Sequence, residues 1–153
     1  MGSWVDLEMI RRIRLLLFVL LSVGGVFAGF PDMIKDIDGT VIDLKQMASK
    51  KRLAVITLKT AECPVCQQQL IRIKEKLSEL IVCNVTFIVL SPGSIDKIQQ
   101  VKSKTEFPYP FIMDEDLTIS KSLNLNMDDN QILPSILILN NKLEIEWEQR
   151  GRN

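Results

Sequence analysis

Two short runs of apolar residues predict strands that are buried on both faces. Residues 53–58 and 85–90 each contain a single polar side chain, a threonine. Near-continuous apolar runs of this length are typical of central strands covered by helices on both sides. Between and after these runs, apolar residues recur at helical spacing and predict two amphipathic helices. Their apolar positions are Leu70, Ile73, Leu77, Leu80 and Ile81 in the first helix, and Ile95, Ile98 and Val101 in the second.

Two other segments alternate around turn residues and predict β-hairpins. Residues 33–44 flank Asp38-Gly39, while residues 135–139 and 143–147 flank an Asn-Asn-Lys turn. Asp-Gly between apolar runs is a strong hairpin signal. The order of strand, helix, strand, helix and terminal hairpin predicts an α/β fold. We expect a three-layer α/β/α sandwich with a mixed central sheet and an N-terminal β-hairpin.

The N-terminal segment has the pattern of an export signal. A basic segment at residues 11–14 precedes an uncharged run at residues 15–30, whose 16 residues fall short of the roughly 20 that span a bilayer. A small residue, Ala28, ends the run. We therefore expect residues 1–28 to be a signal peptide, or an uncleaved signal anchor, and residues 29–153 to form one exported domain. Contact with a membrane is expected only if the segment is uncleaved.

Composition excludes several classes of function. The chain has no histidine, which excludes imidazole bases, histidine-dependent nucleophiles and histidine-containing metal sites. Its 19 basic and 19 acidic side chains balance, and they leave no charge pattern that favours a nucleic-acid partner. Three cysteines are too few for a disulfide scaffold. Carboxylates, lysines and thiols remain as the candidate chemistry.

The cysteine pair in Cys63-Pro64-Val65-Cys66 is the strongest chemical signal in the chain. It lies between a predicted buried strand and a predicted helix, where backbone N–H groups and the helix dipole favour a thiolate. Zinc would need a second pair of ligands, for which only Cys83 remains, so we expect no metal. A passive surface disulfide is the other alternative. A redox-active pair is favoured, and it needs no bound cofactor because the dithiol itself carries two electrons.

From residue 30 to residue 151 the sequence resembles thioredoxin-fold redoxins of the AhpC/TSA family, which includes peroxiredoxins and exported thioredoxin-like reductases. Four segments carry the resemblance in order: residues 36–44, 60–66, 107–114 and 133–139. The resemblance implies that Cys63 is the attacking thiolate and that Cys66 resolves the mixed disulfide. It also implies a cis-proline loop at Leu133-Pro134 that, together with Pro64, binds the substrate chain. The expected partners are protein thiols or disulfides, or a thioredoxin-type electron donor.

The sequence also departs from the patterns of this family. Thr60 resembles the threonine that orients hydroperoxide in peroxiredoxins, but Pro134 stands where their arginine is expected. On the thioredoxin side, Glu62 replaces a tryptophan and Thr57 replaces a buried acid. Thioredoxin folds normally add a last helix, which we expect to be absent here.

Three functions therefore stay open: a thiol–disulfide oxidoreductase, which we favour, a peroxidase that uses Thr60 and Cys63, and a non-catalytic binding module. Four further side chains carry structural expectations. We expect Cys83 to be a free thiol, packed or half-exposed, or else a bridging or second resolving thiol. We expect Asp116 to cap a short helix at residues 117–123, and Phe111 and Trp147 to lie in the core or at a pocket rim.

Overall fold

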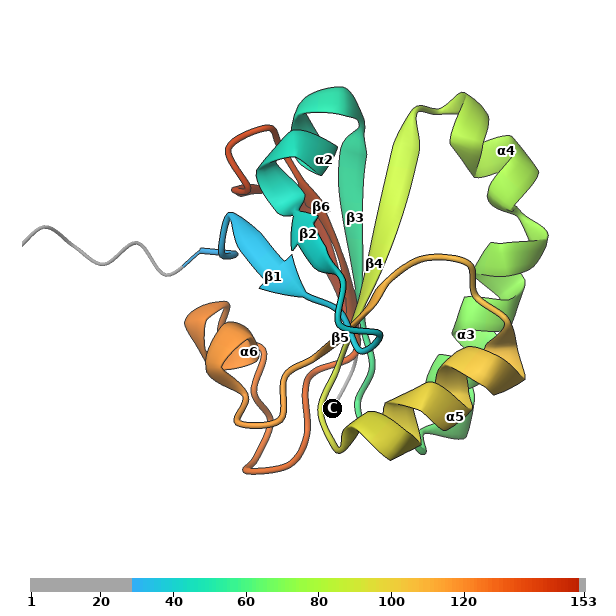
Figure 1. The fold of residues 1–153 in the computed structure, drawn as a ribbon, viewed down its shortest axis with the longest axis vertical. Helices are drawn as coiled ribbons and strands as arrows, with labels where there is room; N and C mark the ends of the chain where they lie inside the picture. Colours follow the sequence, from blue (N-terminus) through green and yellow to red (C-terminus); the bar gives the residue numbers. More distant parts are fainter. Residues whose placement is uncertain (1–28, 152–153) are drawn as a thin grey trace, which may run out of the picture.

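The computed structural model describes residues 29–151, and the predicted signal segment at residues 1–28 lies outside them. Within the described range, the predicted strands and helices appear in the predicted order, and a helix at Leu44–Lys50 that the pattern did not predict follows the N-terminal hairpin (Figure 1). In chain order the elements are β1 (Met33–Lys35), β2 (Val41–Asp43), α2 (Leu44–Lys50), β3 (Arg52–Thr57), α3 (Pro64–Glu75), α4 (Leu77–Val82), β4 (Val85–Ser91), α5 (Ile95–Thr105), β5 (Phe111–Met113), α6 (Thr118–Ser122), β6 (Ser135–Leu139) and β7 (Ile145–Arg150).

Five strands form a mixed sheet in the order β5-β4-β3-β6-β7. Strands β3, β4 and β5 are parallel, whereas β6 is antiparallel to β3 and β7 is antiparallel to β6. Helices α3, α4 and α5 cover one face, and α2, α6 and the β1–β2 hairpin lie over the other (Figure 1). The three-layer sandwich, the mixed sheet and the N-terminal hairpin are confirmed. Among the residues that the structure describes, no helix is both long and apolar enough to cross a membrane.

The central strand β3 supplies side chains to a hydrophobic core on each side of the sheet. Leu53 and Val55 pack beneath α2 and the hairpin, while Ala54 and Ile56 pack beneath α3 and α5. All four are 0–1% exposed. Full burial of a leucine or isoleucine contributes about 1.5–3 kcal/mol, which explains why this run forms the central strand.

The first predicted amphipathic helix is divided in two at Lys76. This residue has φ −99° and ψ 4°, and its N–H turns back to the carbonyl of Ile73 instead of continuing the α-helical pattern. The break separates α3 from α4. Because it comes late in the helix, Leu77 and Leu80 still pack on the core, but Ile81 is 48% exposed.

The N-terminal hairpin turns at Gly39, which has φ +85°. Glycine adopts this conformation without steric cost, as expected for an Asp-Gly turn. The Asp38 carboxylate forms a salt bridge with Lys102 of α5 and accepts a hydrogen bond from Gln99. These contacts fix the turn of the hairpin against a helix of the opposite layer.

The start of α6 differs from the expected arrangement. Asp116 is exposed, and its carboxylate accepts the Thr118 N–H at the long distance of 3.4 Å. Asp114 caps the helix instead: it is 2% exposed, and its two carboxylate oxygens accept the N–H groups of Ile119 and Ser120 at 3.0 and 2.8 Å. The expectation for Asp116 is therefore wrong, because Leu117 in the left-handed conformation (φ +57°) turns the helix start toward the earlier carboxylate.

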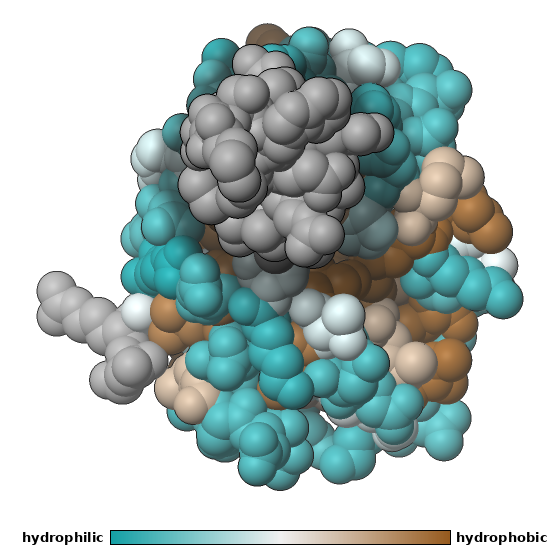
Figure 2. Space-filling view, turned by 90° about the vertical axis from the view of Figure 1, so that its left-hand side faces the viewer, coloured by the Kyte–Doolittle hydropathy of each residue, from teal (hydrophilic) through white to brown (hydrophobic). Residues whose placement is uncertain are grey.

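The two aromatic residues expected in the core or at a pocket rim have different environments. Phe111 is fully buried, whereas Trp147 is 51% exposed on the edge strand β7. Trp147 lines a surface pocket together with Ser122 at the end of α6, so it lies at a pocket rim and not in the core, which is one of the two expected positions. The side of the molecule that carries β1 and α6 is mostly hydrophilic, with hydrophobic side chains gathered toward one part of it (Figure 2).

Candidate active site

The cysteine pair lies at the junction between β3 and α3. Cys63 is the N-cap of α3 and Pro64 occupies its first turn, where the missing N–H has no cost. Cys63 and Cys66 form a disulfide across a Cα–Cα distance of 5.3 Å. Cys66 is 3% exposed, whereas Cys63 is half-buried. The sulfur of Cys63 is therefore the more accessible of the two.

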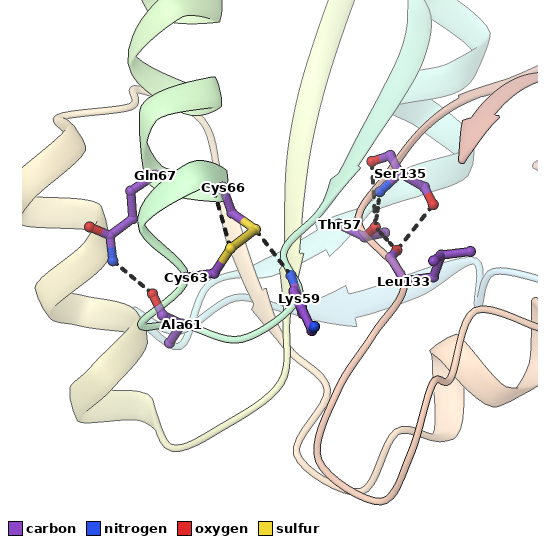
Figure 3. Close-up of a disulfide and its surroundings, with 8 residues drawn as sticks. All are labelled: Thr57, Lys59, Ala61, Cys63, Cys66, Gln67, Leu133 and Ser135. Carbon is purple, nitrogen blue, oxygen red and sulfur yellow. Dashed lines mark hydrogen bonds between the residues drawn. A yellow bond between two sulfur atoms is a disulfide. The ribbon is translucent and has the colours of Figure 1, made fainter. Parts of the chain in front are cut away.

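Backbone N–H groups face both sulfur atoms (Figure 3). The Cys66 N–H donates to Cys63 Sγ at 3.3 Å, and the Lys59 N–H donates to Cys66 Sγ at 3.4 Å. Together with the N-terminal end of α3, these donors stabilise negative charge on sulfur. When the pair is reduced, the site therefore favours a thiolate at Cys63 without a histidine or a buried acid.

The acidic neighbour of the pair is neutralised by a lysine. Glu62 forms a salt bridge with Lys97 of α5. The hydrogen bond from Lys97 lowers the pKa of the Glu62 carboxyl below its usual value. The repulsion expected between Glu62 and a Cys63 thiolate is reduced, because the positive charge of Lys97 lies beside the carboxylate.

The loop that precedes Cys63 is held by Thr60 and Gln67. The Cys63 N–H donates to the carbonyl of Thr60 at 3.3 Å, which places Thr60 directly beside the pair. Gln67, one turn into α3, donates from Nε2 to the carbonyl of Ala61 at 2.9 Å (Figure 3). No sequence signal distinguishes Gln67, because it begins a run of three glutamines and nothing in the pattern separates one from the next.

The Leu133-Pro134 loop runs beside the end of β3. The Thr57 hydroxyl donates to the carbonyl of Leu133 at 2.7 Å and accepts the N–H of Ser135 at 2.7 Å (Figure 3). The N–H of Ile132 donates to the carbonyl of Lys59. The loop thus lies along residues 57–59, whose Lys59 N–H contacts the disulfide. Thr57 anchors this loop. The sequence feature that could have identified it is its position as the single polar residue in an apolar strand.

The cis proline implied by the resemblance is wrong, since no peptide bond among residues 29–151 is cis. The two carbonyls of this segment are instead directed into the protein. That of Leu133 accepts the Thr57 hydroxyl, and that of Pro134 accepts the N–H of Gly151 at 2.6 Å. A Cβ atom at Gly151 would lie 2.7 Å from the same carbonyl, so only glycine permits this approach.

The Thr57 anchor leads to a prediction on stability. Thr57→Val keeps the shape of the side chain but leaves the Ser135 N–H without its acceptor in the buried core. We expect the free energy of unfolding to fall by about 1–3 kcal/mol, the usual cost of an unsatisfied buried donor. Urea denaturation measures it. Thr86→Val in β4, where the side chain is half-buried, is the matched control and should change stability by less than about 0.5 kcal/mol. Equal changes in the free energy of unfolding of the two variants would contradict the role of Thr57 as the anchor of this loop.

The third cysteine lies far from the pair. Cys83 precedes β4, whereas Cys63 follows β3, and the two strands are parallel, so the two residues lie at opposite ends of the sheet. Cys83 is a free, exposed thiol, more open than the packed or half-exposed position expected. It does not approach Cys63 within one folded molecule, which corrects its alternative role as a second resolving thiol there. Within residues 29–151, no three potential metal-ligand side chains cluster together.

Comparison with known proteins agrees with this architecture. The sequence model of the AhpC/TSA family matches residues 29–148. No curated protein sequence matches the chain significantly. Among solved structures, the peroxidoxin BcpB of Mycobacterium tuberculosis is similar with a TM-score of 0.68 and 13% identity, over 77% of this chain and 79% of that one.

Two further structures are similar over more of the chain. A cysteine-to-serine mutant of Xylella fastidiosa PrxQ has a TM-score of 0.68 and 14% identity, over 86% of this chain and 84% of that one. A secreted disulfide oxidoreductase of M. tuberculosis, homologous to E. coli DsbE, has a TM-score of 0.64 and 14% identity, over 85% and 89%. At these identities the similarities establish the thioredoxin-like fold, which two classes of redox protein share.

Proposed function

Because the chain belongs to the AhpC/TSA family and carries a cysteine pair at the start of α3, we propose that it is a thiol–disulfide oxidoreductase. The observation that carries the proposal is the placement of the pair. Cys63 and Cys66 are close enough to form a disulfide, and backbone N–H groups face both sulfur atoms. A site of this kind can exchange two electrons with another dithiol or disulfide without a bound cofactor.

The proposed reaction proceeds in two exchange steps. The Cys63 thiolate attacks one sulfur of a substrate disulfide, forms a mixed disulfide and releases the other substrate sulfur as a thiolate. The Cys66 thiolate then attacks Cys63 Sγ, which closes the intramolecular disulfide and releases the second substrate thiolate. Each released thiolate takes a proton from water. The protein dithiol is thereby oxidised and the substrate disulfide reduced, and the reverse sequence oxidises a substrate dithiol.

The proposed substrates are protein thiols or disulfides and small thiols, and the proposed electron donor is a thioredoxin-type protein. The accessible side of Cys63 is bordered by Pro64, and the Leu133-Pro134 loop lies along residues 57–59, so we propose that a substrate chain contacts both. We also propose that the domain acts after export, as the pattern of residues 1–28 suggests. A disulfide of this kind persists in such compartments.

Peroxide reduction is the second candidate, because Thr60 lies three residues before Cys63, as the threonine of peroxiredoxins does. Cys63 would reduce a hydroperoxide to an alcohol or water and become a sulfenic acid, and the Cys66 thiol would then release water and form the disulfide. The arginine of a peroxiredoxin has no counterpart bonded to either sulfur in the described part of the chain. Arg150, at the same end of the sheet, donates instead to the carbonyls of Asn124 and Leu123.

Rapid mixing of the reduced protein with two oxidants separates the candidates. A disulfide-bonded protein substrate should oxidise the pair and gain two thiols, while hydrogen peroxide should oxidise Cys63 no faster than an ordinary cysteine thiolate. Oxidation by peroxide that is orders of magnitude faster would establish the peroxidase instead. A disulfide that dithiothreitol does not reduce, or a reduced pair that neither oxidant oxidises, would indicate a non-catalytic binding module.

A further inference from the structure

A cleft lies between the start of α3 and helix α5. It has a volume of about 270 Å³, and its lining includes Glu62 and Pro64, the two residues on either side of Cys63 in the sequence. The α5 side of the cleft contributes Lys97 and Lys104. Pockets that bury a complete drug-sized ligand begin at about 300 Å³, so this cleft suits one part of a larger substrate.

Gln67 supplies a hydrogen-bond acceptor in this cleft that has no donor. The residue lines the cleft and is 8% exposed, and its side chain extends from α3 on the side away from the disulfide (Figure 3). Its Nε2 donates to the Ala61 carbonyl. Its Oε1 is the only buried side-chain polar atom without a hydrogen bond among the described residues. An unpaired buried acceptor is unfavourable and is satisfied when a ligand brings an N–H group.

The charges of the cleft favour an acidic partner. The Lys97 ammonium is paired with Glu62, whereas Lys104 forms no salt bridge within residues 29–151. One positive charge is therefore left over beside the unsatisfied acceptor. A carboxylate is attracted to such a lysine, and a peptide N–H fits the Gln67 oxygen.

We propose that this cleft binds an acidic segment of a polypeptide substrate, adjacent to the substrate cysteine that reacts with Cys63. The inference rests on the proposed thiol–disulfide exchange and names the substrate class for it. A backbone N–H of the substrate donates to Gln67 Oε1, and an aspartate or glutamate side chain pairs with Lys104. Pro64 and Glu62 connect the cleft to Cys63, so a chain joined to Cys63 through a mixed disulfide reaches the cleft within a few residues.

The test uses the reduced full-length protein and two disulfide-linked peptides of the same length, which carry either two glutamates or two glutamines beside the cysteine. We expect kcat/KM for the glutamate peptide to be roughly two- to fivefold higher, the range of an exposed ion pair. Lys104→Gln should bring the ratio of the two values close to one, and high salt should reduce it in the unmodified protein. Gln67→Met should raise KM for the glutamate peptide.

Lys142→Gln is the matched control, because it removes one positive charge from the exposed β6–β7 turn at the opposite end of the sheet. It should leave both peptide rates unchanged. Equal kcat/KM values for the two peptides, or a preference that survives Lys104→Gln, would overturn the proposal that the cleft binds an acidic segment. Failure of the unmodified protein to exchange with either peptide or with dithiothreitol would overturn the proposed function itself.

Discussion

Replacement of Cys63 by serine should abolish thiol–disulfide exchange, whereas Cys66→Ser should stop the reaction at a mixed disulfide. Cys63 is the more accessible sulfur and accepts the Cys66 N–H, so it attacks the substrate first. A serine hydroxyl does not ionise near neutral pH, and the expected loss of rate is at least roughly 10³-fold. In Cys66→Ser the first attack still occurs, but no thiolate remains to release the bound substrate. Intact-mass spectrometry detects this covalent complex.

Cys83→Ser is the matched control for both variants. Its thiol is exposed and lies at the opposite end of the sheet from the pair, so the exchange rate should not change. Two outcomes would contradict the assigned order of attack: turnover by Cys63→Ser at the normal rate, or a stable mixed disulfide in Cys63→Ser through Cys66. The first would also remove the chemical basis of the proposed function.

Replacement of Asp114 by alanine should lower the free energy of unfolding by about 3 kcal/mol. The carboxylate is 2% exposed and accepts two N–H groups at the start of α6, those of Ile119 and Ser120. Hydrogen bonds to a charged group contribute about 1.5–3 kcal/mol each, and their loss leaves two donors unsatisfied near the core. Urea denaturation measures the change.

Asp116→Ala provides the comparison within the same turn. Asp116 is exposed, and its carboxylate contacts Thr118 only, so its loss should lower stability far less than the loss of Asp114. Hydrogen bonds from the Thr118 side chain, and then from its N–H, hold the pKa of the Asp116 carboxyl below its usual value, so the small contribution of Asp116 to stability disappears as the pH falls through that lowered pKa. A larger loss for Asp116→Ala than for Asp114→Ala would contradict the assignment of the cap.

Strands and hairpins were predictable because their signals are local. The apolar run that became β3 is buried almost throughout, and few other arrangements hide six such residues from water. The turn at Gly39 follows from an Asp-Gly pair between alternating residues. The placement of Cys63 and Cys66 at a helix start follows from the order of a buried strand, a cysteine pair and an amphipathic segment.

The predictions that failed concern residues whose environment depends on distant parts of the chain. Asp114 and Asp116 are neighbours in one acidic run, and the left-handed conformation of Leu117 decides which one caps α6. The Leu133-Pro134 bond is trans in a loop whose carbonyls are held by Thr57 and Gly151, residues that the sequence separates widely.

The sequence by itself determined the α/β sandwich and the position of the cysteine pair, because burial of apolar runs and the polarity of a helix end act over a few residues. Only the tertiary structure decided what surrounds that pair. It placed Lys97 against Glu62, left Gln67 Oε1 without a donor and set the Thr57 anchor beside the Leu133-Pro134 loop. These contacts join separate elements, and hydrogen bonds and ion pairs depend on distances that no local pattern encodes.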